Sequence, residues 1–202
     1  MDKKLSVSEQ KRHAILNGAK QAFIDQGFAA TSMDHVASIA GVSKRTVYNH
    51  FSSKEDLFSA IVLELVALFS QSMAFTFQAD RPVRDQLIAI ADAKIQVMLN
   101  EDLVQLARLV LSETIRSPDK MCALMDKAQE GDDLFSRFLE EARQQGALQI
   151  EDICFASNQF TSLIKGAVFW PVVVMGQPKP SKEAQAVIVE RTVDMFLASY
   201  EK

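Results

Sequence analysis

Apolar and polar residues follow one another along nearly the whole chain with the spacing of amphipathic helices. A first helix is predicted from Ser8, which can cap it, to Gly27, which can end it in a left-handed conformation. Its apolar stripe consists of Ile15, Leu16, Ala19, Ala22 and Phe23. No segment shows the period of two expected of a strand. The helical spacing predicts further helices over residues 32–40, 43–51, 53–79, 82–100, 102–116, 118–145 (with a possible break at Gly131), 151–175 and 181–200.

Two of the predicted helices form a helix-turn-helix. Thr31 or Ser32 caps the leading helix, Gly41 ends it, and Ser43 caps the next one. Two short helices joined by a glycine turn, the second beginning at a serine, are typical of this motif. The sequence therefore predicts an all-α fold of about nine helices. A three-helix domain with the helix-turn-helix spans residues 1–52, and a helical regulatory and dimerisation domain spans residues 53–202.

The second helix of this motif is predicted to expose hydrogen-bond donors and bury only two residues. Val47 and Phe51 lie four residues apart, as in a buried stripe, while Arg45 and Asn49 point away from Val47 at about 100° per residue. A helix of this kind fits the major groove of DNA, where arginine pairs with guanine and asparagine with adenine. A solvated surface helix is the alternative, but it would not require the glycine turn, the cap and the docking pair. The other donors are Lys44, Thr46, Tyr48 and His50.

The charge distribution agrees with this assignment. Residues 1–56 contain 8 Lys/Arg and 6 Asp/Glu (8 − 6 = +2), and residues 57–202 contain 14 and 20 (14 − 20 = −6). The whole chain has a net charge of −4, so it is not a general polyanion binder. A mildly basic N-terminal part on an acidic remainder indicates that only the N-terminal part contacts nucleic acid.

The segment Thr31 to Phe58, TSMDHVASIAGVSKRTVYNHFSSKEDLF, resembles the DNA-binding signature of the TetR/AcrR family of bacterial repressors. The predicted regulatory and dimerisation domain, residues 53–202, is called the body below. Three of its segments, LARLVLSE, GALQIED and VDMFLASY, are similar to the AefR-like branch of that family. The resemblance implies phosphate contacts at Thr31, Thr46, Tyr48, His50 and Lys54. It places Ser43, Lys44, Arg45 and Asn49 where such proteins approach base edges. Arg45 stands where many members have glycine, which suggests an additional contact.

The body is rich in Phe and Met at predicted interior positions, and such side chains suit an adaptable ligand cavity. Plain core packing is the alternative for most of them taken singly. Glu113 and Gln159 interrupt the apolar pattern, and a polar group that faces a core needs a partner, which a ligand or an internal hydrogen bond can supply. The predicted ligand-binding residues are Phe69, Met73, Phe77, Met98, Leu106, Glu113, Met125, Phe155, Gln159 and Phe160.

The last two predicted helices carry apolar faces that suit a dimer interface, with internal packing as the alternative. Pairing of two helices between chains gives the two-fold symmetry that two DNA half-sites require. The predicted interface residues are Leu163, Gly166, Phe169, Trp170, Val189, Val193, Phe196 and Tyr200.

Other functional classes find less support in the sequence. No His follows His50, no acid/base or nucleophile set appears, and no metal-ligand spacing occurs, so we expect no enzyme, cofactor or metal site. No long apolar run or signal segment is present, so a cytoplasmic location is expected. The sequence thus predicts a homodimeric repressor that binds palindromic operator DNA and is released by a small apolar inducer. In one alternative, the N-terminal DNA-binding domain (the head) has the same function, but the body binds a protein partner in place of a small molecule. An enzyme with an accessory DNA-binding head is a weaker alternative.

Overall fold

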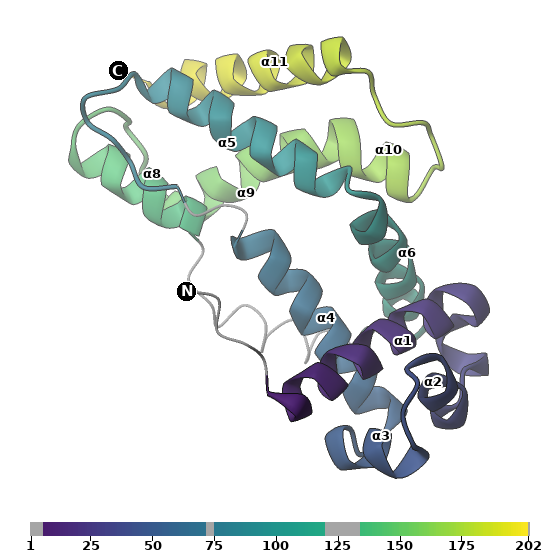
Figure 1. Ribbon diagram of the computed structural model, residues 1–202. Helices are drawn as coiled ribbons and strands as arrows, with labels where there is room; N and C mark the ends of the chain where they lie inside the picture. Colours follow the sequence, from purple (N-terminus) through teal and green to yellow (C-terminus); the bar gives the residue numbers. More distant parts are fainter. Residues whose placement is uncertain (1–5, 72–74, 120–133, 202) are drawn as a thin grey trace. The chain divides into compact units, whose positions relative to one another are not determined.

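The computed structural model describes residues 6–71, 75–119 and 134–201, and these are helical apart from loops and one isolated bridge between Leu148 and Glu201 (Figure 1). The predicted all-α fold is confirmed. The first helices are α1 (Val7–Ala30), α2 (Met33–Ile39), α3 (Lys44–His50), α4 (Lys54–Gln71), α5 (Val83–Met98) and α6 (Glu101–Arg116). They are followed by α8 (Leu134–Gln144), α9 (Ile153–Ile164), the π-helix η1 (Lys165–Phe169), α10 (Trp170–Val173) and α11 (Lys182–Tyr200). Within the described ranges no helix is long and apolar enough to cross a membrane.

The chain divides into two compact units. The first comprises Met1–Val66 and Gln105–Ala128, and the second comprises Ala67–Val104 and Gln129–Lys202, as far as these ranges are described. This division by packing differs from the predicted functional boundary after residue 52, because most of α4 and α6 belongs to the first unit. The functional boundary itself stays a prediction.

In the first unit, α1 packs on α2 and α3, and α2 packs on α3 (Figure 1). A Cβ atom at Gly18 would lie only 3.0 Å from the backbone nitrogen of Ala40, so the glycine permits the close approach of α1 and α2. Gly27 has φ 80° and ψ 157°, which interrupts the helical backbone near the predicted end of α1. The buried side chains of this unit include Ile15, Leu16, Phe23, Val36, Val47, Leu57 and Ile61.

The first helix begins at a different serine from the predicted one. Ser6, not Ser8, caps α1: its hydroxyl accepts a hydrogen bond from the Glu9 backbone N–H, and the Glu9 carboxylate accepts one from the Ser6 N–H. This reciprocal capping box satisfies two amides at once and therefore fixes the helix start. The hydrogen bonds from Ser6 lower the pKa of Glu9.

In the second unit, α5 packs along α11 and contacts α9 and η1, while α9 packs on α8 and α11 (Figure 1). Aromatic rings connect three of these helices. The ring of Phe160 lies 4.9 Å from that of Phe135 and 5.1 Å from that of Phe196, measured between centroids. All three side chains are at most 2% exposed, so they form the centre of this unit.

The helix predicted from residue 53 to 79 is shorter than expected, since α4 ends at Gln71 and residues 75–78 are not helical. Side chains from later helices bind the free backbone groups of this segment. Glu141 accepts a hydrogen bond from the Phe77 N–H at 3.0 Å, and Gln86 accepts one from the Gln78 N–H at 2.8 Å. The Gln86 amide also donates to the carbonyl oxygens of Gln78 and Arg81. These distant partners make an extended segment possible where the local pattern favoured helix.

Candidate nucleic-acid interface

The recognition helix α3 is held by its cap and by two buried side chains. The Ser43 hydroxyl accepts a hydrogen bond from the Thr46 N–H at 3.1 Å and also pairs with the Thr46 hydroxyl at 2.8 Å. Val47 is fully buried and Phe51 is 5% exposed, so they dock the helix as predicted. The guanidinium of Arg12, on α1, lies 5.2 Å from the Phe51 ring centroid and covers this anchor.

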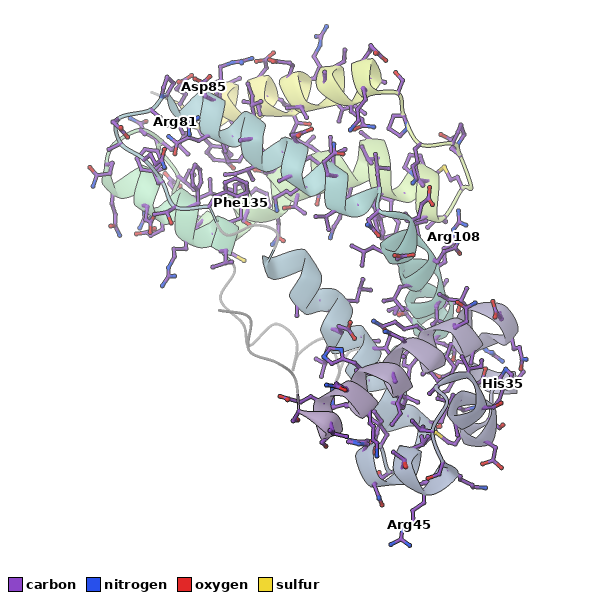
Figure 2. The ribbon with its side chains drawn as sticks, in the orientation of Figure 1. His35, Arg45, Arg81, Asp85, Arg108 and Phe135 are labelled. Atoms are coloured by element: carbon purple, nitrogen blue, oxygen red, sulfur yellow. The ribbon has the colours of Figure 1, made fainter. Side chains whose placement is uncertain are left out.

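The outward face of α3 carries the predicted base-reading side chains. Arg45 and Asn49 are exposed, and Figure 2 shows Arg45 projecting away from the helices of the first unit. Tyr48 is 45% exposed and lies next to them on the helical wheel. Thr46 and His50 are half-buried at the margins of the face. The structure therefore brings together on one surface the donors of α3 that the sequence assigned to DNA.

Lys44 has a partner that the sequence analysis missed. Its ammonium lies 2.8 Å from the carboxylate of Asp34, on α2, and 6.0 Å from the Tyr48 ring centroid. The hydrogen bond from Lys44 to Asp34 raises the pKa of the lysine. Both side chains are 61% exposed, so the pair contributes little to stability. Its effect is to hold a carboxylate on the surface expected to meet DNA.

Two predicted phosphate contacts do not agree with the structure. Thr31 is 3% exposed, and its hydroxyl donates to the carbonyl oxygens of Ala22 and Gly27, so this side chain secures the end of α1. The ammonium of Lys54 donates to three carbonyl oxygens near the same helix end, those of Phe28, Ala29 and Thr31, at 2.7, 3.0 and 3.0 Å. An ammonium has three N–H donors, and here all are engaged within the protein.

The N-terminus of α4 is also occupied by an acidic side chain. Asp56 donates its backbone N–H to the Ser53 hydroxyl at 3.0 Å, and its carboxylate accepts a hydrogen bond from the Ser52 hydroxyl. The hydrogen bonds from Ser52 and Ser53 lower the pKa of Asp56, which keeps it ionised. A carboxylate already complements the positive end of the helix dipole there. The negative charge already present at this helix end is a second argument against a phosphate contact at Lys54.

The predicted ligand-binding residues do not form one described site. Met98 and Phe160 are buried, and Phe77 is half-buried with its ring 5.6 Å from that of Phe138. Leu106 is buried, but it belongs to the first unit, whereas the other three predicted residues belong to the second. The side chains of Phe69, Met73 and Met125 lie outside the described residues.

Three of the polar or aromatic ligand candidates are placed differently from the prediction. Phe155 is 57% exposed, so the prediction that it faces the interior is wrong. Gln159 is exposed as well, and its side-chain oxygen accepts a hydrogen bond from the Tyr200 hydroxyl. Glu113 has 16% of its side chain exposed and pairs with Arg116 at 3.5 Å on its own helix. This ion pair is an internal partner, which the sequence analysis had left open as the alternative to a ligand.

The predicted dimer residues separate into two groups. Val189, Val193 and Phe196 are at most 4% exposed and pack inside the second unit, so assigning them to an interface is wrong. Internal packing of α11 on α5 and α9 explains their apolar pattern. Trp170 is 42% exposed and Gly166 is exposed, and both stay available for an interface. The others, Leu163, Phe169 and Tyr200, are half-buried.

An apolar groove lies beside the buried stripe of α11. It has a volume of about 530 Å³ and runs between α9 with η1 and α11. Met195, which is 60% exposed, contributes to it, although the sequence analysis did not select this residue. The lining is completed by Gln159, Ser162, Leu163, Gly166, Phe196, Ser199 and Tyr200.

Two lysines of the second unit were also missed. Lys94, on α5, is 3% exposed, and Lys165, in η1, is half-buried. A signal for Lys94 was present, because it falls on the apolar stripe of α5 at helical spacing from Ile90, Ala91 and Met98. Lys165 had no such signal, since its burial depends on the π-helix and on packing against α5.

The first unit defines a helix-turn-helix DNA-binding protein, because α2 and α3 form the motif and α3 exposes the donors. A family model described as bacterial regulatory proteins of the tetR family matches residues 15–61. A second, described as the AefR-like transcriptional repressor C-terminal domain, matches residues 85–202. The chain belongs to the TetR family of transcriptional regulators and has an AefR-like C-terminal domain. Members of this family are regulators and not enzymes, as the sequence predicted.

Individual relatives agree with this assignment. A TetR family regulator from Pseudomonas syringae pv. tomato str. DC3000 is 35% identical, with a TM-score of 0.82 over 95% of this chain and 97% of that one. The protein named Flavonoid-responsive Regulator FrrA is 29% identical, with a TM-score of 0.78 over 96% and 98% of the two chains. The transcriptional activator FasR of Mycolicibacterium smegmatis is 43% identical over 54 residues, which is 27% of this chain and 25% of FasR. This chain therefore covers about a quarter of FasR.

Proposed function

We propose that the protein is a homodimeric repressor that binds palindromic operator DNA and releases it when a small molecule binds the body. The observation that carries the proposal is the exposure of Arg45 and Asn49 on a helix anchored by Val47. Arginine and asparagine are the side chains that pair bidentately with guanine and adenine in the major groove. The AefR-like repressor domain matched over residues 85–202 supports repression as the direction of control.

Dimerisation is supported by the apolar residues that α9 to α11 leave exposed. Met195, Trp170 and Val187 are 60%, 42% and 59% exposed, and Met195 borders the groove between α9 and α11. A second copy placed on this face by a two-fold axis would cover the apolar surface of both chains. Two recognition helices about 34–36 Å apart would then match successive major grooves on one side of the DNA.

Ligand control is supported by the family relationship and by the chain's connectivity. A related protein of known structure, 29% identical to this chain, is named as flavonoid-responsive, and flavonoids are small aromatic molecules. The helix α4 starts directly after the helix-turn-helix, and its residues belong to both units. A ligand that shifts α4 would alter the separation of the two recognition helices. Because only one separation fits both half-sites, a small shift would lower operator affinity greatly.

The test begins with selection of the operator from random duplexes, followed by footprinting of the full chain. A library of aromatic small molecules is then screened by thermal shift, and each hit is assayed for release of the operator. By thermodynamic linkage, operator DNA must weaken ligand affinity by the same factor by which ligand weakens DNA affinity. Arg45→Ala is the matched control, since it should bind ligand normally while losing operator preference.

Two outcomes would contradict the proposal. If no sequence is enriched over random DNA, the protein is not an operator-binding regulator. If an operator is found but no compound changes its affinity, and a co-purified protein does, then the body binds a protein partner and not a small molecule.

A further inference from the structure

Many of the positive charges in the N-terminal part are already paired within the protein. The Lys and Arg residues between positions 6 and 56 are Lys11, Arg12, Lys20, Lys44, Arg45 and Lys54. Lys20 pairs with Glu64 at 2.7 Å, on α4. Lys44 pairs with Asp34 at 2.8 Å, and Lys54 donates to the carbonyl oxygens at the end of α1. Among the described residues, the other cations of this set make no hydrogen bond or ion pair, so they are free to meet a polyanion.

One of these free cations, Arg12, lies at the end of the recognition helix. It projects from α1, which packs on α3 (Figure 1). Its guanidinium lies over the ring of Phe51, 5.2 Å from the centroid, and Phe51 directly follows the last residue of α3. Arg12 is exposed, whereas the ring beneath it is buried. A guanidinium placed over a ring is held in position and still has N–H groups at its edge for a further partner.

The dimensions of DNA place such a group beside a phosphate. A helix with its side chains is about 10–12 Å across and the major groove is about 12 Å wide, so a helix in the groove fills it. The seven residues of α3 span about 10 Å. A group next to the end of α3 therefore lies at the edge of the groove, where the sugar-phosphate backbone runs. Lys11, the neighbouring free cation, points about 100° away from Arg12 around α1 and so away from this position.

We infer that Arg12 binds a DNA phosphate at the edge of the major groove that α3 enters. The Phe51 ring orients the guanidinium, so the residue that docks α3 also positions this contact. Arginine matches a phosphate with two parallel N–H···O bonds, and the pair gains further from release of condensed counterions. Arg12 thus supplies a phosphate contact in place of Thr31 and Lys54, whose donors are used inside the protein. The inference rests on the proposed operator-binding function and adds to it a residue outside the helix-turn-helix.

A salt titration of the full chain measures the contact. Binding to the selected operator and to a random duplex of the same length is followed by fluorescence anisotropy over a range of KCl concentrations. Arg12→Met should reduce the magnitude of the slope of log K against log [KCl] by about 0.9 for each bound chain, because one phosphate fewer is neutralised. Affinity should fall about tenfold per chain and by a similar factor on both duplexes, since a phosphate contact carries no sequence information. Arg12→Lys should restore the slope but only part of the affinity, because an ammonium does not pair bidentately.

Lys11→Met is the matched control, since it removes the same charge from the adjacent position of α1. It should leave both the slope and the affinity close to those of the unmodified protein. Urea unfolding of each variant separates binding from folding. Arg12→Met keeps a flexible apolar side chain over the Phe51 ring, so this variant should be fully folded under the conditions of the titration.

A second measurement locates the phosphate itself. Uncharged methylphosphonate replaces one phosphate at a time along the operator. At a position bordering the groove, the replacement should weaken binding of the unmodified protein about tenfold and have no further effect on Arg12→Met. Such non-additivity is what two groups in direct contact show.

Three results would overturn the inference: an unchanged slope in Arg12→Met, an equal loss of slope in Lys11→Met, or no phosphate whose neutralisation leaves Arg12→Met unaffected. An unchanged slope together with lower stability would leave Arg12 with a structural role only, as the cover of Phe51. The proposed function is judged separately on the same samples. If no operator is enriched but Arg12→Met flattens the slope on random DNA, operator binding fails and the Arg12 contact stands. If an operator is bound with an unchanged slope, the reverse holds.

Discussion

Lys54 and Phe28 are joined twice: the lysine ammonium donates to the Phe28 carbonyl oxygen at 2.7 Å and lies 4.6 Å from the centroid of the Phe28 ring. Phe28 follows the break in α1 at Gly27, and Lys54 is the first residue of α4. The contact therefore ties the end of α1 to the start of α4 within the first unit. Since carbonyl oxygens at a helix end need donors, the lysine has a structural role there.

The first prediction concerns this lysine. Lys54→Met should lower the free energy of unfolding by about 1–3 kcal/mol, because it leaves carbonyl oxygens without their donor. Lys54→Arg should not restore stability, since a planar guanidinium cannot converge on three carbonyl oxygens as an ammonium does. Urea unfolding of both variants checks this, with the exposed Lys11→Met as a charge-matched control. A phosphate contact would give the opposite result: normal stability, rescue by arginine and a salt-dependence slope reduced by about one.

The second prediction concerns base recognition. Arg45→Ala and Asn49→Ala should each weaken binding to the preferred operator by about 1–3 kcal/mol and relax the sequence preference at the contacted position. Tyr48→Phe, at the margin of the same face, should weaken binding to all sequences alike, because a phosphate contact carries no sequence information. Footprinting and selection with each variant distinguish the two kinds of contact. An unchanged site preference in Arg45→Ala would refute direct readout by this residue.

The third prediction concerns the pair between Lys44 and Asp34. Asp34→Asn removes a carboxylate from the DNA-facing surface and frees the lysine, so affinity for both specific and random DNA should rise. The gain should shrink as salt increases, since exposed charges are screened. Titrations at two salt concentrations measure it, and unfolding stability should change by no more than about 1 kcal/mol. Equal or weaker DNA binding by Asp34→Asn would show that Asp34 is needed to orient Lys44.

The fourth prediction separates the core of α11 from its outer face. Phe196→Ala should lower the free energy of unfolding by about 3–5 kcal/mol, because the ring packs on Phe160 and Tyr200 at centroid distances of 5.1 and 4.7 Å. Met195→Glu should leave the fold intact and produce monomers in sedimentation, with operator affinity falling toward that of one half-site. A dimer that survives Met195→Glu would place the interface on another surface.

The sequence by itself determined the helix-turn-helix and the outward face of α3. The reason is that these features depend on interactions within a few residues. The Ser43 cap, the turn at Gly41 and the spacing of Val47 and Phe51 act along one short segment, so local periodicity was sufficient. The helical class of the body followed in the same way from its apolar spacing. Helix ends were less predictable: the sequence analysis chose Ser8, whereas Glu9 lies three residues after Ser6, and this capping-box spacing starts the helix after Ser6.

Only the tertiary structure decided which groups are available for function. On α11, the apolar stripe of Val189, Val193 and Phe196 suits a dimer interface and internal packing alike, and these side chains are at most 4% exposed. The packing of α5 and α9 against α11 decides for internal burial. Lys54 likewise offers the same three donors to a phosphate or to carbonyl oxygens. The broken end of α1, distant in sequence, brings those oxygens within 3.0 Å, and this proximity assigns the lysine.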